Sequence, residues 1–220
     1  MNRVLQAAVF VSCMALAAFG GAAMNQPQSP AKPAPPAAPG GIDKKAFMAA
    51  IDRAGGPAPE HAFLEPMVGE FDCEVSMWPR PGAEPIKAKA TSRGAWILGK
   101  RFVQLENTAP ADEDLKVDTM QILGYDKRTA RYFNWGIDST NTYCLLARGM
   151  RDASDGTFTL LGRDEVPGRK HTSFKQVIRV QDENHFSVEV LVQAPNAAGS
   201  DVEGWFQTVK IEYTRKPAAK

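Results

Sequence analysis

From Gly69 to the C-terminus, short apolar stretches alternate with polar positions in the pattern of half-buried strands. The stretches are rich in Val, Ile, Phe, Tyr and Thr, and turn residues such as Asp155-Gly156 and Pro167-Gly168 separate them. About ten strands are predicted, over residues 69–78, 86–96, 100–108, 117–125, 130–138, 141–151, 157–163, 172–181, 185–193 and 204–215.

No long helical period interrupts this series, so a βαβ architecture is excluded. Consecutive strands joined by short turns favour an up-and-down antiparallel sheet, and closing such a sheet into a barrel removes its exposed edges. We therefore predict an all-β fold, an up-and-down antiparallel barrel of about ten strands, occupying residues 57–216.

Two short helical segments are predicted before the first strand. The first covers residues 42–56, with Asp43 as its N-cap and Gly55-Gly56 as its end. The second covers residues 59–67. Their apolar positions are Phe47, Met48 and Ile51 in the first segment and Phe63, Leu64 and Met67 in the second.

The N-terminal segment is typical of a cleaved signal peptide. A basic start with Arg3 precedes an uncharged, apolar run over residues 4–23, and small residues close that run. We place cleavage after Ala23, so that residues 1–23 address the protein to the periplasm or the exterior. An uncleaved membrane anchor is the alternative, since roughly 20 apolar residues span a bilayer, but Gln6 and Ser12 weaken it.

Residues 24–41 are composed almost entirely of Pro, Ala, Gln, Ser and Gly, and are predicted to be a disordered linker. The whole chain of 220 residues has 26 Lys and Arg against 25 Asp and Glu, a net charge of +1. This balance removes the positive field that nonspecific nucleic-acid binding needs. No nucleic-acid partner is expected, and no stable membrane insertion once the leader is removed.

Several short motifs follow one another along the predicted barrel domain, at Glu60-His61-Ala62-Phe63-Leu64, Val68-Gly69-Glu70-Phe71, Trp78, Trp96-Ile97-Leu98-Gly99-Lys100-Arg101-Phe102, Leu123-Gly124-Tyr125-Asp126, Trp135-Gly136-Ile137-Asp138-Ser139 and Tyr213-Thr214-Arg215-Lys216. Together they resemble the bacterial family called domain of unknown function 1579, over roughly residues 57–216. Phe71 stands where that family usually has Trp.

The resemblance implies a lipocalin-like barrel and no assigned reaction. It also implies a structural group that closes the barrel floor, in which an Arg from the last strand crosses an aromatic residue of the first. The corresponding residues are Gly69, Phe71 and Arg215. A guanidinium can stack on an aromatic face and keep its hydrogen bonds, so we assign this group a structural role.

A barrel of this size is either filled by side chains or holds one small ligand. Trp135 shares one face of its strand with Phe133 and Ile137, and we expect that face to line the interior. The predicted ligand-binding residues are Trp96, Trp135, Tyr143 and Asp138. The alternative is that the aromatic residues only pack the core.

No catalytic residue, metal site or cofactor is predicted, because no nucleophile elbow or phosphate loop is present. His61, His171 and His185 lack the spacing of a metal site and are expected on the surface or in loops. His171 is the best of three weak candidates for the inward histidine that a haem-binding barrel would need.

Cys73 and Cys144 remain after processing, in a compartment where thiols can pair. Strand alternation turns Cys73 inward and Cys144 outward, which disfavours a disulfide unless a bulge shifts the register. We expect free thiols, and leave the pairing open.

Three functions follow from these observations. The first is an exported barrel that binds a small hydrophobic or aromatic ligand. The second is an enzyme of the same fold, which needs a buried acid or base such as Asp138 or Glu106 with a raised pKa. The third is a structural or interaction module of the cell envelope that uses the outer face of the barrel.

Overall fold

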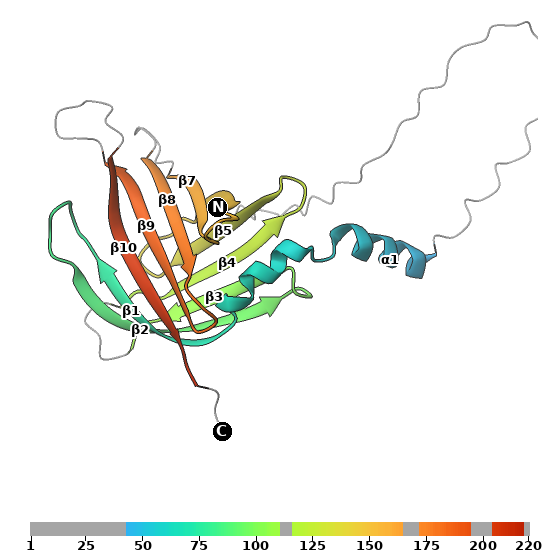
Figure 1. Cartoon of the computed structure of the whole chain (residues 1–220), viewed down its shortest axis with the longest axis horizontal. Coiled ribbons are helices and arrows are strands. Elements are labelled where there is room, and N and C mark those ends of the chain that lie inside the picture. The colour runs from blue at the N-terminus through green and yellow to red at the C-terminus, as the bar shows by residue number, and fades with distance from the viewer. Residues whose placement is uncertain (1–42, 111–115, 165–171, 195–203, 218–220) are drawn as a thin grey trace, which may run out of the picture. The chain divides into compact units, whose positions relative to one another are not determined.

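The computed structural model describes residues 43–110, 116–164, 172–194 and 204–217. Residues 44–220 form one compact unit, which contains a closed antiparallel barrel of ten strands (Figure 1). The predicted fold class is therefore confirmed. The leader and linker predicted at residues 1–41, and His171, lie outside the described residues.

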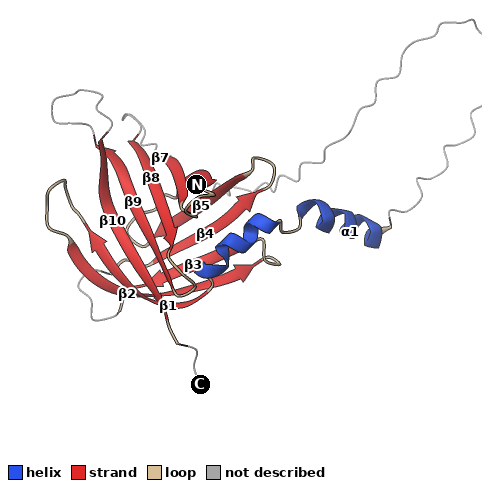
Figure 2. Ribbon diagram, viewed as in Figure 1, coloured by secondary structure: helices blue, strands red, loops and turns tan. Residues whose placement is uncertain are grey.

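Two helical segments precede the barrel, the α-helix α1 (Lys44–Gly55) and the 3-10 helix η1 (Pro59–Met67) (Figure 2). Neither helix, within the described ranges, has the length and apolar character needed to cross a membrane. The strands are β1 (Gly69–Met77), β2 (Ile86–Ile97), β3 (Phe102–Thr108), β4 (Thr119–Asp126), β5 (Arg131–Asp138), β6 (Leu145–Arg151), β7 (Phe158–Asp164), β8 (Thr172–Val180), β9 (His185–Ala194) and β10 (Gly204–Arg215).

Each strand pairs with its neighbours in the sequence, and β10 returns to pair with β1, which closes the barrel. The closing register runs from Phe71 opposite Arg215 to Met77 opposite Val209. A bulge between Gln207 and Val209 shifts the pairing of β10 with β9. Closure satisfies the backbone groups of both terminal strands, which would otherwise be exposed edges.

The core fills the inside of the barrel at the end that η1 covers. Along β1, Phe71 and Cys73 are buried while Glu70 and Asp72 are exposed, as expected for a strand with one inward face. Leu64 and Met67 of η1 add to the same core. The core cluster comprises Leu64, Met67, Phe71, Cys73, Ala90, Val103, Leu105, Leu123, Tyr132, Ala147, Phe158, Leu160, Phe174, Ile178, Phe186, Val188 and Tyr213.

The sequence pattern predicts that the face of β5 that carries Phe133 and Trp135 lines the interior of the barrel, and this prediction is wrong. Tyr132 and Asn134 are the buried, inward residues of this strand, while Phe133 and Trp135 are half-buried on the outer face. Asn134 is tolerated inside because its amide donates to Gln121 Oε1 at 2.7 Å and to Gln176 Oε1 at 3.0 Å. These hydrogen bonds satisfy the amide NH2 group and offset part of the cost of burying this side chain, whose Oδ1 has no partner among the described residues.

Candidate ligand-binding site

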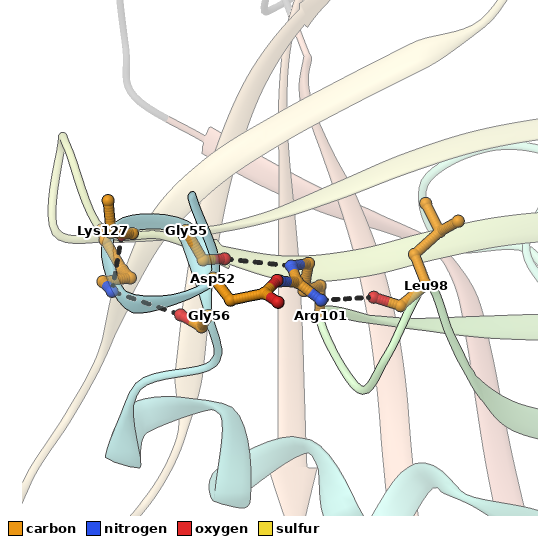
Figure 3. Close-up of polar contacts among 7 residues, drawn as sticks. Asp52, Gly55, Gly56, Leu98, Arg101 and Lys127 are labelled. Carbon is orange, nitrogen blue, oxygen red and sulfur yellow. Dashed lines mark hydrogen bonds and ion pairs between the residues drawn. The ribbon is translucent and has the colours of Figure 1, made fainter. Parts of the chain in front are cut away.

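The C-terminal end of α1 is fastened to the turn between β2 and β3 by Arg101 (Figure 3). The guanidinium donates to the carbonyl oxygen of Gly55 at 3.0 Å and forms an ion pair with Asp52 at 3.1 Å. It also donates to the carbonyl of Leu98 at 3.1 Å in its own turn. A cation at a helix C-terminus complements the helix dipole and satisfies carbonyls that have no partner within the helix.

Lys127, in the turn between β4 and β5, supplies a second fastening (Figure 3). Its ammonium donates to the carbonyl oxygens of Ala54 at 3.1 Å and Gly56 at 3.2 Å. Two turns of the barrel therefore hold the same helix end. This arrangement holds the C-terminal end of α1 next to these turns.

The outer wall next to α1 is apolar, and two rows of cross-strand neighbours build it. In the first row, Phe102, Gly124, Phe133 and Arg148 lie opposite one another on β3, β4, β5 and β6. A Cβ on Gly124 would lie 2.7 Å from atoms of both phenyl rings. The missing side chain lets the two rings approach, and their centroids are 6.0 Å apart.

The second row consists of Ile122, Trp135 and Leu146 on β4, β5 and β6. All three side chains are half-buried although they are on the outer face. Directly opposed residues on one face of a sheet are close enough to form a continuous surface. The two rows together make an aromatic and aliphatic floor.

A cavity of about 920 Å³ lies over this floor, and we call it the outer pocket. Its volume is within the range of about 300–1,000 Å³ typical of small-molecule sites. The pocket is lined by Ile51, Ala54, Gly55, Gly56, His61, Ile97, Leu98, Arg101, Phe102, Ile122, Tyr125, Asp126, Lys127, Arg128, Phe133, Trp135, Leu146 and Arg148.

One acidic side chain, Asp126, lines the pocket beside four basic ones. Arg128 donates to the two carboxylate oxygens of Asp126, at 3.1 Å each. These hydrogen bonds lower the pKa of Asp126 to about 2. The carboxylate therefore stays ionised at neutral pH, and it compensates the charge of Arg128.

Of the residues that the sequence nominates for ligand binding, Trp135 lines the outer pocket. Trp96 does not; its indole donates to Glu65 Oε2 at 2.7 Å, and its ring packs against the core. Tyr143 does not line the pocket either, because β6 begins only at Leu145 and the tyrosine, 54% exposed, precedes it.

Asp138 lies at the end of β5, away from the outer pocket, and organises the following turn. It accepts hydrogen bonds from the Thr140 backbone at 2.8 Å and from the Asn141 amide at 2.7 Å. Partial burial acts to raise the pKa of Asp138, but these hydrogen bonds outweigh it and lower the pKa. Glu106, the other carboxylate considered for catalysis, is exposed and accepts from Gln104.

The expectation that the histidines lie on the surface or in loops is wrong for His61. This residue is buried in η1, where its Nδ1 lies 3.0 Å from the Ala58 amide nitrogen, and its ring meets Tyr125 edge-on. His61 is buried because Leu64 and Met67 pack η1 against the core. His185 is exposed. Within the described ranges, no three His, Cys, Asp or Glu side chains are grouped as metal ligands.

The structure brings Gly69, Phe71 and Arg215 together at the covered end of the barrel. The guanidinium carbon of Arg215 lies 4.8 Å from the centroid of the Phe71 ring. Gly69 has φ +141°, and a Cβ there would be 2.2 Å from Nη1 of Arg215. Only glycine fits both the backbone conformation and the contact.

Cys73 and Cys144 are both free thiols, the first buried and the second exposed. Burial raises the pKa of the Cys73 thiol to about 12, and the neighbouring Asp72 acts in the same direction. Because the thiolate is the reactive form, we expect iodoacetamide at pH 8 to modify Cys144 at least about a hundredfold faster than Cys73 in the folded protein. Peptide mass spectrometry over time measures both rates, and equal rates would contradict the burial of Cys73.

Arg101, Lys127 and Arg148 were missed by sequence reasoning. The first two act on α1 across 46 to 73 positions of the chain, a separation that no local pattern reveals. The sequence does indicate the orientation of Arg148, since alternation along β6 places it on the same face as Leu146. Because a ligand was expected inside the barrel, this outward-facing residue was not predicted to belong to a binding site.

These features define a lipocalin-like barrel with a pocket on its outer wall. The family described as "Protein of unknown function (DUF1579)" matches residues 56–215, so the chain belongs to this family. A search of curated proteins gave no match.

Solved structures with a similar fold include the following two. Rv2717c from M. tuberculosis has 14% sequence identity and a TM-score of 0.50, covering 73% of this chain and 99% of its own. The S-type phycobiliprotein lyase CPES from Guillardia theta has 12% identity and a TM-score of 0.45, covering 76% and 98%. At such identities the similarity concerns the fold alone.

Proposed function

We propose that this protein is an exported lipocalin-like barrel that binds a small hydrophobic or aromatic ligand in the outer pocket. The observation that carries the proposal is the cavity of about 920 Å³ over an aromatic and aliphatic floor. Contiguous apolar surface on a soluble domain commonly marks a binding site. The ligand is held by burial of its apolar body against Trp135, Phe133 and Leu146.

Export is supported by the first 23 residues, which have the parts of a cleaved signal peptide. The Pro-rich segment 24–41 then acts as a spacer before the folded domain. The protein would work in the periplasm or outside the cell.

The enzyme hypothesis receives no support from the two carboxylates considered for it. An acid–base catalyst of this kind needs a raised pKa, whereas the pKa of Asp138 is lowered and Glu106 is exposed. An envelope interaction module is the competing function, because the same apolar floor can receive a protein segment.

The test uses protein recovered from the envelope fraction of its own host, with the intact mass measured first. The neutral dye Nile red is expected to bind with a rise in fluorescence, and Trp135→Ala is expected to weaken binding about tenfold through lost aromatic contact. Trp205→Ala is the matched control, since Trp205 is also a half-buried tryptophan but does not line the pocket.

Equal binding by both variants and the unaltered protein would contradict the site. A mass that retains the first 23 residues would contradict cleavage of the leader. Failure to bind the dye, together with recovery as a stable complex with another envelope protein, would favour the interaction module.

A further inference from the structure

Three of the four basic side chains that line the outer pocket already have partners. Arg101 pairs with Asp52 and donates to carbonyls of α1. Lys127 donates to two carbonyls of the same helix end, and Arg128 pairs with Asp126. Their hydrogen-bonding capacity is engaged in holding the walls of the pocket.

Arg148 differs from these three. It is exposed on the outer face of β6, and its backbone pairs with the neighbouring strands, but among the residues that the structure describes none forms a hydrogen bond or ion pair with its guanidinium. It lies directly opposite Phe133, and Leu146 precedes it on the same face. A guanidinium with no partner in the described ranges therefore lies at the edge of the apolar floor.

We infer that the ligand of the outer pocket is an apolar carboxylic acid whose carboxylate is bound by Arg148. This inference rests on the proposed function and specifies the chemical class of its ligand. The planar guanidinium can donate two parallel hydrogen bonds to a carboxylate. With the carboxylate at Arg148, the apolar body of the ligand extends over Trp135, Leu146 and Ile122.

The remaining charges of the pocket favour the same class of ligand. Asp52 and Asp126 compensate the charges of Arg101 and Arg128, which leaves Lys127 and Arg148 as the cations of the lining without a carboxylate partner among the described residues. The lining therefore has a positive potential, so an anion is attracted and a cationic ligand is disfavoured. A neutral ligand of the same shape would gain the apolar contacts only. Discrimination between an acid and its neutral analogue is therefore assigned to Arg148.

The test compares lauric acid with 1-dodecanol, which has the same chain length and no charge, by calorimetric titration of the processed, full-length mature protein at pH 8. We expect lauric acid to bind about tenfold more tightly than 1-dodecanol, as a charge-assisted hydrogen bond implies. Arg148→Gln should remove this preference without changing 1-dodecanol binding, and Arg148→Lys should retain part of it. Arg163→Gln, another exposed arginine that does not line the pocket, is the control.

The results separate this inference from the proposed function. If both probes bind equally, or if Arg148→Gln leaves the preference for the acid intact, the assignment to Arg148 is wrong and the pocket remains a binding site. If neither probe binds and Nile red does not bind, both proposals fail. A thermal melt of each variant, expected to match that of the unaltered protein because Arg148 is exposed, excludes unfolding as the cause.

Discussion

Replacing Arg215 with Ala is expected to lower the free energy of unfolding by about 2–4 kcal/mol. The guanidinium donates to the carbonyl oxygens of Val68 at 2.6 Å, Pro66 at 2.9 Å and Glu183 at 2.9 Å. These carbonyls belong to the end of η1 and to the turn between β8 and β9. One side chain therefore joins the last strand to two segments that cover the end of the barrel.

The ring beneath Arg215 adds to this effect. Phe71 is fully buried and meets Phe186 and Tyr213 edge-on, with centroid distances of 5.1 Å and 6.1 Å. Removing the guanidinium exposes one face of this aromatic group and loses the cation–π contact, which contributes about 0.5–2 kcal/mol. Phe71 and Arg215 thus form a stacked pair, with the guanidinium carbon 4.8 Å from the ring centroid.

Urea unfolding followed by circular dichroism measures the change, with Arg93→Ala as the control. Arg93 is exposed on the outer face of β2, so its replacement should change the stability by less than about 0.5 kcal/mol. Arg215→Lys should lose most of the stabilisation, since an ammonium cannot reproduce the fork of donors. An Arg215→Ala variant as stable as the Arg93→Ala variant would show that the group does not hold the barrel end.

The strands were predictable because turn residues separate them and because most inward positions are apolar. Alternation correctly predicted that Cys73 on β1 faces inward and that Cys144 faces outward. On β5 the same rule failed. Its inner face carries Asn134, which hydrogen-bonds to other amides, while its outer face carries Trp135, which lines the outer pocket. Because the outer face is the more hydrophobic one, the pattern predicted it to be the inner face.

The position of the pocket could not be predicted for a related reason. A pocket on the outer wall needs both an apolar outer face and a helix end held next to it. The alternation along β4 to β6 indicates the apolar outer face. The position of the helix end depends on hydrogen bonds from Arg101 and Lys127 to residues far away in the chain, which no local pattern predicts. Apolar residues on a barrel strand are normally assigned to the interior, and Trp135 was assigned accordingly.

Replacing Gly94 with Ala is expected to destabilise the protein by about 3 kcal/mol or more, because the new methyl group would meet backbone on a packed helix. A Cβ on Gly94 would lie 1.8 Å from the carbonyl oxygen of Met67, the last residue of η1. A side chain can rotate away from such a contact, but a carbonyl can move only with its helix. Leu64 and Met67 would then leave the core together.

Gly136→Ala is the matched control, since Gly136 also lies within a barrel strand and a Cβ there would be 3.5 Å from the nearest atom, an ordinary contact. We expect its effect on the free energy of unfolding to stay below about 1 kcal/mol. Trp96 provides a local reporter, because its indole donates to Glu65 of η1 and its emission should shift to the red when η1 is displaced. Equal stabilities of the two variants, with no shift in emission, would mean that η1 does not depend on its close approach to β2.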